Sequence, residues 1–259
     1  MSRKKVLLWL SVAVVSVVAT VLFSLPASWV GLAIEKQTAG RIVLGDVQGS
    51  FWRGSAFVGV AADKNSAVTP LFPGRFAWKI SPMILLGQLL VEVENSSALS
   101  APVQLTGNFT QWRVSPAGLN LPSERLEGLG APLNTIGPTG KILLSWGDLD
   151  MMQIDAKIML NGRVQLEMSE MASRASSIKP LGSYKVTMHW RGDVADLDLT
   201  TSKGPMMLEG NGKLNQGKFQ FSGKAYAEPG QEEKMANLLN LLGRRRQEGD
   251  KQIIALEYK

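Results

Sequence analysis

The sequence predicts a mainly β protein that begins with one membrane-spanning helix. Three observations carry this prediction: residues 6–25 contain no charged side chain, most of the remaining chain alternates apolar and polar residues, and Gly, Pro and Asn separate the alternating segments. Only two short helical segments interrupt this pattern. We therefore expect a curled antiparallel β meander with two short helices, shaped as a sandwich, a half-barrel or a folded half-pipe. Part of its apolar face could instead meet a lipid or another protein.

The uncharged segment 6–25 is long enough to cross a bilayer. At about 1.5 Å per helical residue it covers about 30 Å, the thickness of the hydrocarbon core. Arg3, Lys4 and Lys5 precede the segment, so the positive-inside rule keeps residues 1–5 in the cytoplasm and sends the rest across. A cleaved signal peptide is the alternative, but its apolar core is only about 7–15 residues long. The pattern favours an uncleaved anchor.

The next residues, 26–40, predict a short amphipathic helix that begins near Pro26 and ends at Gly40. Residues 41–259 would then form a β-rich domain on the far side of the membrane. In its first part we expect five strands, at residues 41–47, 55–61, 72–80, 85–94 and 103–114. Residues 115–139 are rich in Pro and Gly and predict a subdivision or an ordered crossover.

The second half of the chain shows cleaner alternation. Asn161-Gly162 predicts a tight turn between strands 154–160 and 163–168. Further strands are expected at residues 184–190, 197–200 and 218–225, with turns at 204–205, 210–212 and 216–217. Residues 232–242 predict an amphipathic helix that ends at Gly243, and residues 253–257 predict a last strand.

Composition excludes several functional classes. Without the three basic residues of the tail, 25 Lys and Arg stand against 22 acidic residues, which is too balanced for a nucleic-acid surface. The chain has no cysteine and one histidine, so neither disulfides nor a zinc or iron site is expected.

Catalytic patterns are present only as near misses. Ser176 and Lys179 fit Ser-x-x-Lys, but the accompanying Ser-Asp-Asn and Lys-Thr-Gly motifs are missing. Gly210-Asn211-Gly212 begins a dinucleotide-binding pattern, but Asn215 occupies the place of the third glycine. His189 falls on the polar face of its strand, with no activated Ser or Cys in its context. We expect no catalytic residue, no cofactor and no metal.

Tryptophan and arginine supply the candidate binding residues. Trp52, Trp78, Trp112 and Trp190 are candidate contacts for a partner or lipid, since Trp is enriched at interfaces. The alternative is packing, because a glycine closely follows Trp52, Trp146 and Trp190. Arg244, Arg245 and Arg246 could bind anionic lipid or a partner, or form the solvated edge of the C-terminal helix.

The chain resembles the N component of bacterial type II secretion systems, the general secretion pathway protein N family. The resemblance lies in the order and spacing of several stretches along nearly the whole chain. These are the basic tail and span leading to Leu25-Pro26-Ala27-Ser28-Trp29, residues 49–56, the Trp78 segment with Pro82 and Leu85, residues 182–186, residues 204–212 and the Leu-rich helix ending at 242–245.

The resemblance implies a bitopic inner-membrane protein whose bulk is periplasmic and which works in the export of folded proteins. It implies no catalytic residues. Its partners would be other secretion subunits, of the inner-membrane platform or the outer-membrane pore, and the inner membrane itself. Three hypotheses remain, in this order: a secretion subunit that binds other proteins, a lipid-binding or envelope-maintenance protein that uses the apolar face of its sheet, and a periplasmic enzyme.

Overall fold

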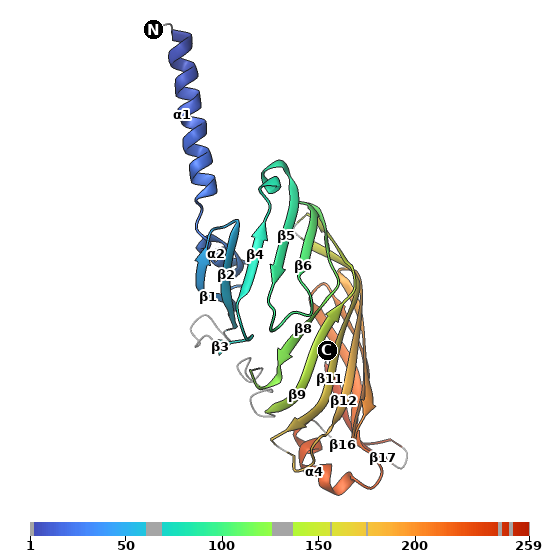
Figure 1. The fold of residues 1–259 in the computed structure, drawn as a ribbon. Coiled ribbons are helices and arrows are strands. Elements are labelled where there is room, and N and C mark those ends of the chain that lie inside the picture. Colours follow the sequence, from blue (N-terminus) through green and yellow to red (C-terminus); the bar gives the residue numbers. More distant parts are fainter. Residues whose placement is uncertain are drawn as a thin grey trace.

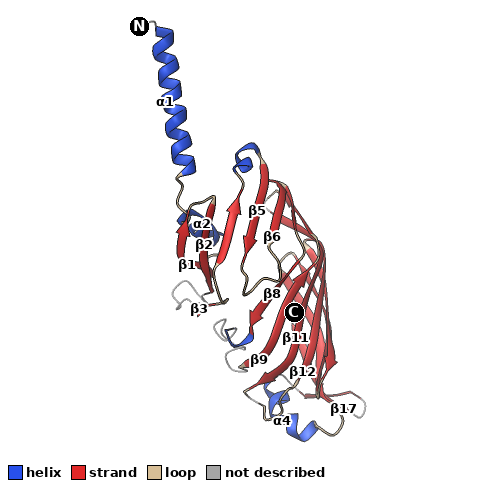
Figure 2. Cartoon of the chain, in the orientation of Figure 1, coloured by secondary structure: helices blue, strands red, loops and turns tan. Residues whose placement is uncertain are grey.

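A long antiparallel sheet and a projecting N-terminal helix make up the structure (Figure 1). The computed structural model describes residues 3–60, 69–125, 137–155, 157–174, 176–242, 245–248 and 251–258. Figure 2 shows that strands dominate, that α1 and α2 lie near one end of the sheet and that α4 lies near the other. The mainly β fold with few helices is as the sequence predicts.

The described helices are α1 (Arg3–Phe23), α2 (Ser28–Gln37), the 3-10 helix η1 (Pro82–Leu86) and α4 (Glu232–Leu242). The described strands are β1 (Ile42–Gly49), β2 (Arg53–Val60), β3 (Thr69–Pro70), β4 (Phe76–Ile80), β5 (Gln88–Glu94), β6 (Val103–Asn108), β7 (Gln111–Val114), β8 (Ala117–Pro122), β9 (Pro138–Trp146), β10 (Leu149–Ile154), β11 (Lys157–Ser173), β12 (Gly182–Gly192), β13 (Val194–Lys203), β14 (Met206–Asn215), β15 (Lys218–Ala227), β16 (Arg245–Glu248) and β17 (Lys251–Tyr258).

All the described strands belong to one sheet of 17 strands. Most neighbours in the sheet are also neighbours in sequence, as in a meander, and β10 joins the first part to the second by pairing with both β7 and β11. In the described residues, β1 pairs only with β2 and β16 only with β17, so the sheet is open at both ends. The structure thus has an open antiparallel sheet, a feature that the half-barrel and the folded half-pipe share.

The longest strand, β11, carries a bulge that bends the sheet. The pairing register shifts between Met168 and Met171 toward β12, and between Ser169 and Ala172 toward β9. Glu170 has a φ of +52°, and its N–H leaves the ladder to bond the Ser183 hydroxyl at 3.0 Å. Because a bulge bends its strand and increases the local twist, this irregularity contributes to the curl.

Two helices cover opposite ends of the apolar face of the sheet. At the N-terminal end, α2 and the residue before it pack over β1, β2 and β4, where Ala27, Ala56 and Trp78 are buried together. At the C-terminal end, α4 inserts Met235 and Leu238 against β15 and β17. Helix α4 has the predicted bounds, since its buried residues recur at helical spacing.

Helix α1 extends away from the sheet (Figure 1). Its described apolar side chains are exposed, for example Trp9, Val15 and Phe23. Within the described part of the chain, no helix satisfies both the length and the hydropathy needed to cross a bilayer, and the predicted span is therefore unconfirmed.

The predicted turn at Asn161-Gly162 is wrong. Strand β11 runs straight through it, and the chain turns instead at Asp155, whose φ is +53°. Gly162 is required for a different reason: a Cβ there would lie 2.6 Å from Leu149 Cδ2 and 2.9 Å from the Asp148 carbonyl oxygen. The glycine permits a close approach between chain segments.

The predicted turn at residues 210–212 is also wrong, because these residues lie inside β14. Gly210 pairs with Gly223, and Gly212 pairs with Phe221. A Cβ on Gly210 would lie 2.6 Å from Phe221 Cζ, so the glycines make room for an aromatic ring over the sheet. The turns predicted at residues 204–205 and 216–217 are present, the second with positive φ at Gln216 and Gly217.

Three expected segments have different bounds. Residues 103–114 form a hairpin of β6 and β7, because the Asn108 side chain accepts hydrogen bonds from the Thr110 and Gln111 N–H groups and turns the chain. The strands expected from residues 72 and 85 begin only at Phe76 and Gln88. Strand β8 lies inside the turn-rich segment 115–139, of which residues 126–136 are outside the described residues.

Candidate functional site

The apolar face is continuous across the sheet and carries four tryptophans. Residues paired across an antiparallel ladder point to the same face. Following the register from Trp78 through β5 to β7 reaches Trp112, and continuing through β10 and β11 reaches Trp190 and, on β9, Trp146. The alternation predicted for β12, with Tyr184, Val186, Met188 and Trp190 on one face, is consistent with this register.

Two of the candidate contact residues are core side chains. Trp52 is 8% exposed and donates its indole N–H to the Leu22 carbonyl at 2.8 Å. Trp78 is 7% exposed and donates to the Phe51 carbonyl at 3.0 Å. Its ring lies against Gly54, where a Cβ would be 2.4 Å from Trp78 Cζ2, so the packing interpretation holds for this residue. A contact role for either residue stays a prediction.

Trp112 and Trp190 are half-buried. The Trp112 indole N–H lies 2.9 Å from Met151 Sδ on the neighbouring strand β10. Trp190 lies on β12 opposite Gly162 and Ala195, two small residues that leave space for its ring. The structure thus keeps part of both rings accessible and places them on one face, but it does not bring them together with Trp52.

The expected arginine cluster is only partly described. Arg244 lies outside the described residues, and Arg245 and Arg246 begin strand β16. The interpretation of this run as a helix edge is wrong for Arg245 and Arg246, because pairing with Ile253 and Ile254 draws them into the sheet. The exposed Arg246 Nη1 lies 3.9 Å from Glu257 Oε1. Lipid or partner binding by these arginines stays a prediction.

The near misses of the sequence do not assemble into chemistry in the described residues. The Ser176 hydroxyl accepts a hydrogen bond from the Ile178 N–H, as in a local turn, while Lys179 is exposed. Within the described residues there is no group of three or more His, Asp and Glu that could hold a metal ion.

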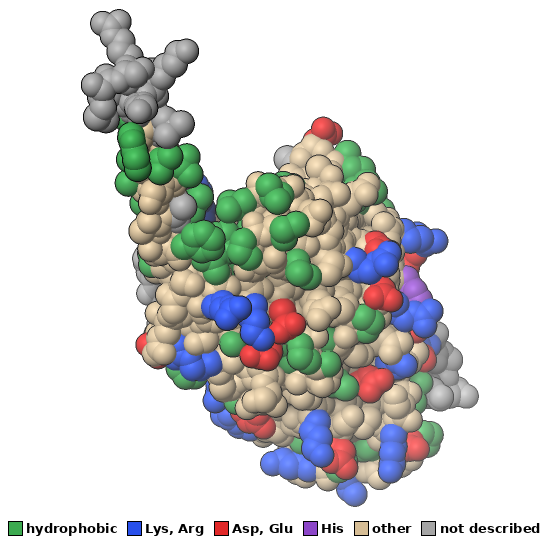
Figure 3. Space-filling view, turned by 45° about the horizontal axis from the view of Figure 1, so that its top comes forward, with side chains coloured by type: hydrophobic (Ala, Val, Ile, Leu, Met, Phe, Trp, Pro, Cys, Tyr) green, Lys and Arg blue, Asp and Glu red, His purple; other side chains and the backbone are tan. Residues whose placement is uncertain are grey.

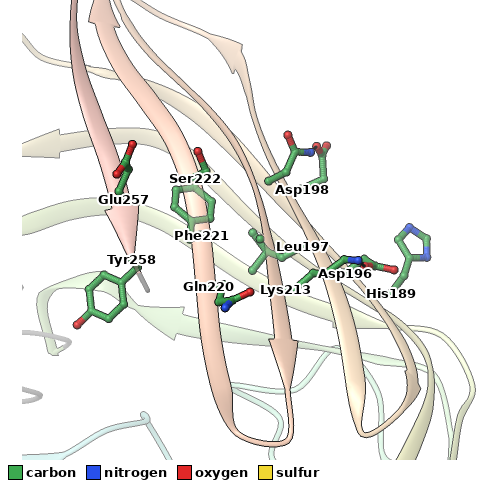
Figure 4. A pocket seen from close by; sticks show the side chains of 12 residues that line it. His189, Asp196, Leu197, Asp198, Lys213, Gln220, Phe221, Ser222, Glu257 and Tyr258 are labelled. Atoms are coloured by element: carbon green, nitrogen blue, oxygen red, sulfur yellow. Dashed lines mark hydrogen bonds and ion pairs between the residues drawn. The ribbon is translucent and has the colours of Figure 1, made fainter. Parts of the chain in front are cut away.

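The polar face bears a groove that the sequence did not reveal. This polar groove, of about 740 Å³, runs across β12, β13, β14, β15 and β17 (Figure 4). Two ladders of paired side chains form its sides. The first ladder contains His189, Asp196, Lys213 and Gln220, and the second contains Asp198, Asn211, Ser222 and Glu257. Only the strand register brings these residues together, and each alone is an ordinary polar residue of a half-exposed strand.

Charge and hydrogen bonding organise the polar groove. Asp196 pairs with Arg191 and lies 3.8 Å from Lys213 Nζ. Asn211 donates to Asp198 Oδ1 at 2.8 Å. His189 and Ser222 are three strands apart, about 14 Å at the usual strand spacing, so they cannot form a nucleophile–base pair. The groove is also lined by Leu197, Phe221 and Tyr258, so the arrangement suits recognition of groups that combine polar and apolar parts.

Three ionisable groups elsewhere have shifted pKa values. A hydrogen bond from Gln48, and then one from Arg75 at 2.6 Å, lower the pKa of Asp46. A hydrogen bond to Asp150 raises the pKa of Arg113. Burial raises the pKa of Tyr184, whose hydroxyl has no hydrogen-bond partner. The first two shifts result from hydrogen bonds between exposed side chains, whereas the third results from a hydroxyl within the core.

Together these features define a class: a β-rich scaffold that presents an apolar face and a grooved polar face for binding. The model of the family described as type II secretion system protein N matches residues 40–253. The chain therefore belongs to this family, as the sequence resemblance indicated, and is a component of a type II secretion system. Membership implies interaction with other subunits of that system. No curated protein and no solved structure matches the chain.

Proposed function

We propose that the protein is anchored in the inner membrane by α1, holds its sheet in the periplasm, and acts by binding other subunits during export of folded proteins. Its family membership over residues 40–253 carries the assignment to secretion. The uncharged segment 6–25, the preceding Arg3, Lys4 and Lys5, and the exposed apolar side chains of α1 support the anchor and its orientation.

The polar groove is the surface that we assign to subunit binding. It combines a hollow with carboxylates, an amide and a lysine whose positions are fixed by neighbouring strands. A rigid sheet pays little ordering entropy when a partner docks on it. Its carboxylates are paired within the sheet, Asp196 with two cations and Glu257 with Arg246. The groove therefore presents mixed charge and fits a partner segment that carries both charged and hydrogen-bonding groups.

Site-specific photo-cross-linking in the secreting bacterium tests this assignment. A photoreactive residue at Gln220, inside the polar groove, should cross-link to another secretion subunit. The matched control is Glu167, which is also exposed on a paired strand but lies outside the groove. Equal cross-linking from both positions, or none from Gln220 during active secretion, would contradict the assignment.

A lipid-binding role is the second candidate, favoured by the apolar face between α2 and α4. There Phe219 stacks on Phe221 with ring centroids 6.2 Å apart, and Tyr258 follows at 6.0 Å from Phe219. Phe219 and Tyr258 remain 38% and 69% exposed, and a contiguous exposed apolar patch is typical of a surface that binds a ligand or partner. Mass spectrometry of the detergent-solubilised protein would show bound phospholipid in the wild type and its loss in a Phe219→Ser, Tyr258→Ser variant. Absence of lipid from the wild type would exclude this role.

A further inference from the structure

The end of the sheet next to α1 carries a cluster of exposed apolar side chains, which we call the apolar rim. It consists of Met83, Leu85 and Leu86 of η1, Leu90 of β5, and Phe109 in the β6–β7 turn. Leu86, Phe109 and Leu85 are 76%, 60% and 56% exposed. Figure 3, in which the top of Figure 1 comes forward, shows hydrophobic side chains gathered beside the base of α1. Exposure of this extent on adjacent segments indicates a covering surface.

The strand register brings the two parts of the rim together. Gln88 pairs with Asn108, so η1 and the β6–β7 turn lie at the same end of neighbouring strands. The next turn continues the rim, because the Gln153 N–H donates to the Thr110 carbonyl at 2.7 Å and the exposed Ile154 follows. The rim is therefore one surface, built from three turns that are neighbours along the same edge of the sheet.

The rim is fixed close to the point where α1 leaves the sheet. Trp52 donates to the Leu22 carbonyl, and the Phe51 N–H donates to the Leu25 carbonyl at 2.8 Å. Phe23, at the end of α1, lines the same hollow of about 670 Å³ as Pro82 and Leu90. If α1 enters a bilayer, the rim cannot be remote from the surface of that bilayer.

The chemistry of this end of the molecule matches a phospholipid leaflet. Residues 21–34, 80–91 and 103–112 contain no ionisable side chain, whereas 19% of the whole chain is charged. Arg53 and Lys79 lie below the rim, opposite each other on β2 and β4, and line the same hollow. Glu92 lines it too and forms an ion pair with Lys79 at 3.1 Å, so this level carries two cations and one carboxylate. Trp29, exposed at the start of α2, adds a side chain favoured at membrane interfaces. Apolar tips above a level with a net positive charge complement acyl chains above anionic phosphates.

We propose that the apolar rim inserts into the periplasmic leaflet of the bilayer that holds α1, with Arg53 and Lys79 at the level of the lipid phosphates. This inference rests on the proposed anchoring of α1. The rim would add a second membrane contact and set the tilt of the sheet. A single helix followed by a short connection would restrict that tilt less.

Depth-dependent fluorescence quenching tests the insertion on the full chain. The protein contains no cysteine, so single Leu86→Cys, Phe109→Cys and Val15→Cys variants can each carry one environment-sensitive fluorophore. The matched control is Glu228→Cys, which is exposed after β15 near α4. The variants are placed in nanodiscs of phosphatidylethanolamine and phosphatidylglycerol, with quenching nitroxides attached either near the headgroup or deep in the acyl chain.

We expect shallow nitroxides to quench the labels at positions 86 and 109, deep nitroxides to quench the label at position 15, and neither to quench the label at 228. Quenching at 15 without quenching at 86 and 109 would overturn the rim proposal and leave the anchor intact. A label at 86 that is shielded from water but not quenched would show a protein contact and would also overturn it. No quenching at 15 would remove the anchor and the rim proposal together.

Arg53 allows an independent check of the phosphate contact. Arg53→Gln should weaken the dependence of quenching at position 86 on the fraction of phosphatidylglycerol, because one cation at the headgroup level is lost. The same substitution should leave quenching at position 15 unchanged. An unaltered dependence on anionic lipid would exclude Arg53 from the contact.

Discussion

Replacing Tyr184 with Phe, which removes only the hydroxyl group, should stabilise the protein. Tyr184 is 5% exposed and lies in a cluster with Ile142 and Met171. Its hydroxyl is buried without a hydrogen-bond partner. A buried unsatisfied polar group costs about 1–3 kcal/mol, and Phe fills nearly the same volume. Allowing for a small loss of packing where the oxygen was, we expect a gain of about 1 kcal/mol in the free energy of unfolding at pH 7.

The pH dependence provides a second, independent signature. Burial raises the pKa of Tyr184 above the ordinary value of 10.0. Above pH 10 the unfolded chain therefore releases a proton that the folded chain retains, and the linkage relation makes stability fall as pH rises. Below pH 10 the full stability of the wild type is retained. Above pH 10 its free energy of unfolding should fall by up to about 1.4 kcal/mol per pH unit because of this group. Tyr184→Phe removes this dependence.

Thermal unfolding and urea unfolding, each followed by circular dichroism, measure the two effects. The variant should unfold at a midpoint about 2–4 °C higher in a thermal scan, and its advantage should widen between pH 9 and pH 11. The control is Tyr258→Phe, because Tyr258 is 69% exposed and neither effect should appear there. A Tyr184→Phe variant that is destabilised by more than its experimental error would show that the hydroxyl has a partner, and the reasoning would fail.

Two further predictions concern packing. Met235→Ala should lower the free energy of unfolding by about 2–5 kcal/mol, since Met235 is 0% exposed between α4 and the sheet. Urea unfolding measures this loss, and the control Lys234→Ala, on the exposed side of α4, should change the free energy of unfolding little. Gly54→Val should lower the free energy of unfolding by about 1–3 kcal/mol or more, because a Cβ there would lie 2.4 Å from the Trp78 ring. Tryptophan fluorescence should change as the ring is displaced. Unchanged emission and stability would contradict the packing.

The period of the sequence predicts strands and faces well, because it reflects a local property of the chain. On β12, the alternation assigns Tyr184 and Trp190 to one face and His189 to the other, in agreement with their burial. Helix α4 has its predicted bounds because its acidic first turn and apolar stripe are local signals too. Where the determining contact lies close in sequence, the sequence alone suffices.

The errors come from contacts that are distant in sequence. Asn161-Gly162 has the chemistry of a turn, but Gly162 is needed because Leu149, on another strand, approaches too closely for a Cβ. Gly210 likewise accommodates the ring of Phe221. The polar groove was missed for the same reason, since a pair such as Asp196 and Lys213 becomes adjacent only when the register is known.

The openness of the sheet bears directly on how such a protein can work. In the described part of the chain, α2 and α4 pack over the two ends of the sheet and much of both faces stays accessible, so many apolar side chains are half-buried rather than enclosed. A half-buried side chain contributes less stabilisation than one in a closed core. The hydrogen bonds of the long ladder and the packing of the two end helices must therefore supply the rest of the stability. The same openness keeps a polar and an apolar surface available together on one rigid element. Because Trp52 and Phe51 join that element to α1 by hydrogen bonds, the orientation of α1 determines which way both surfaces face.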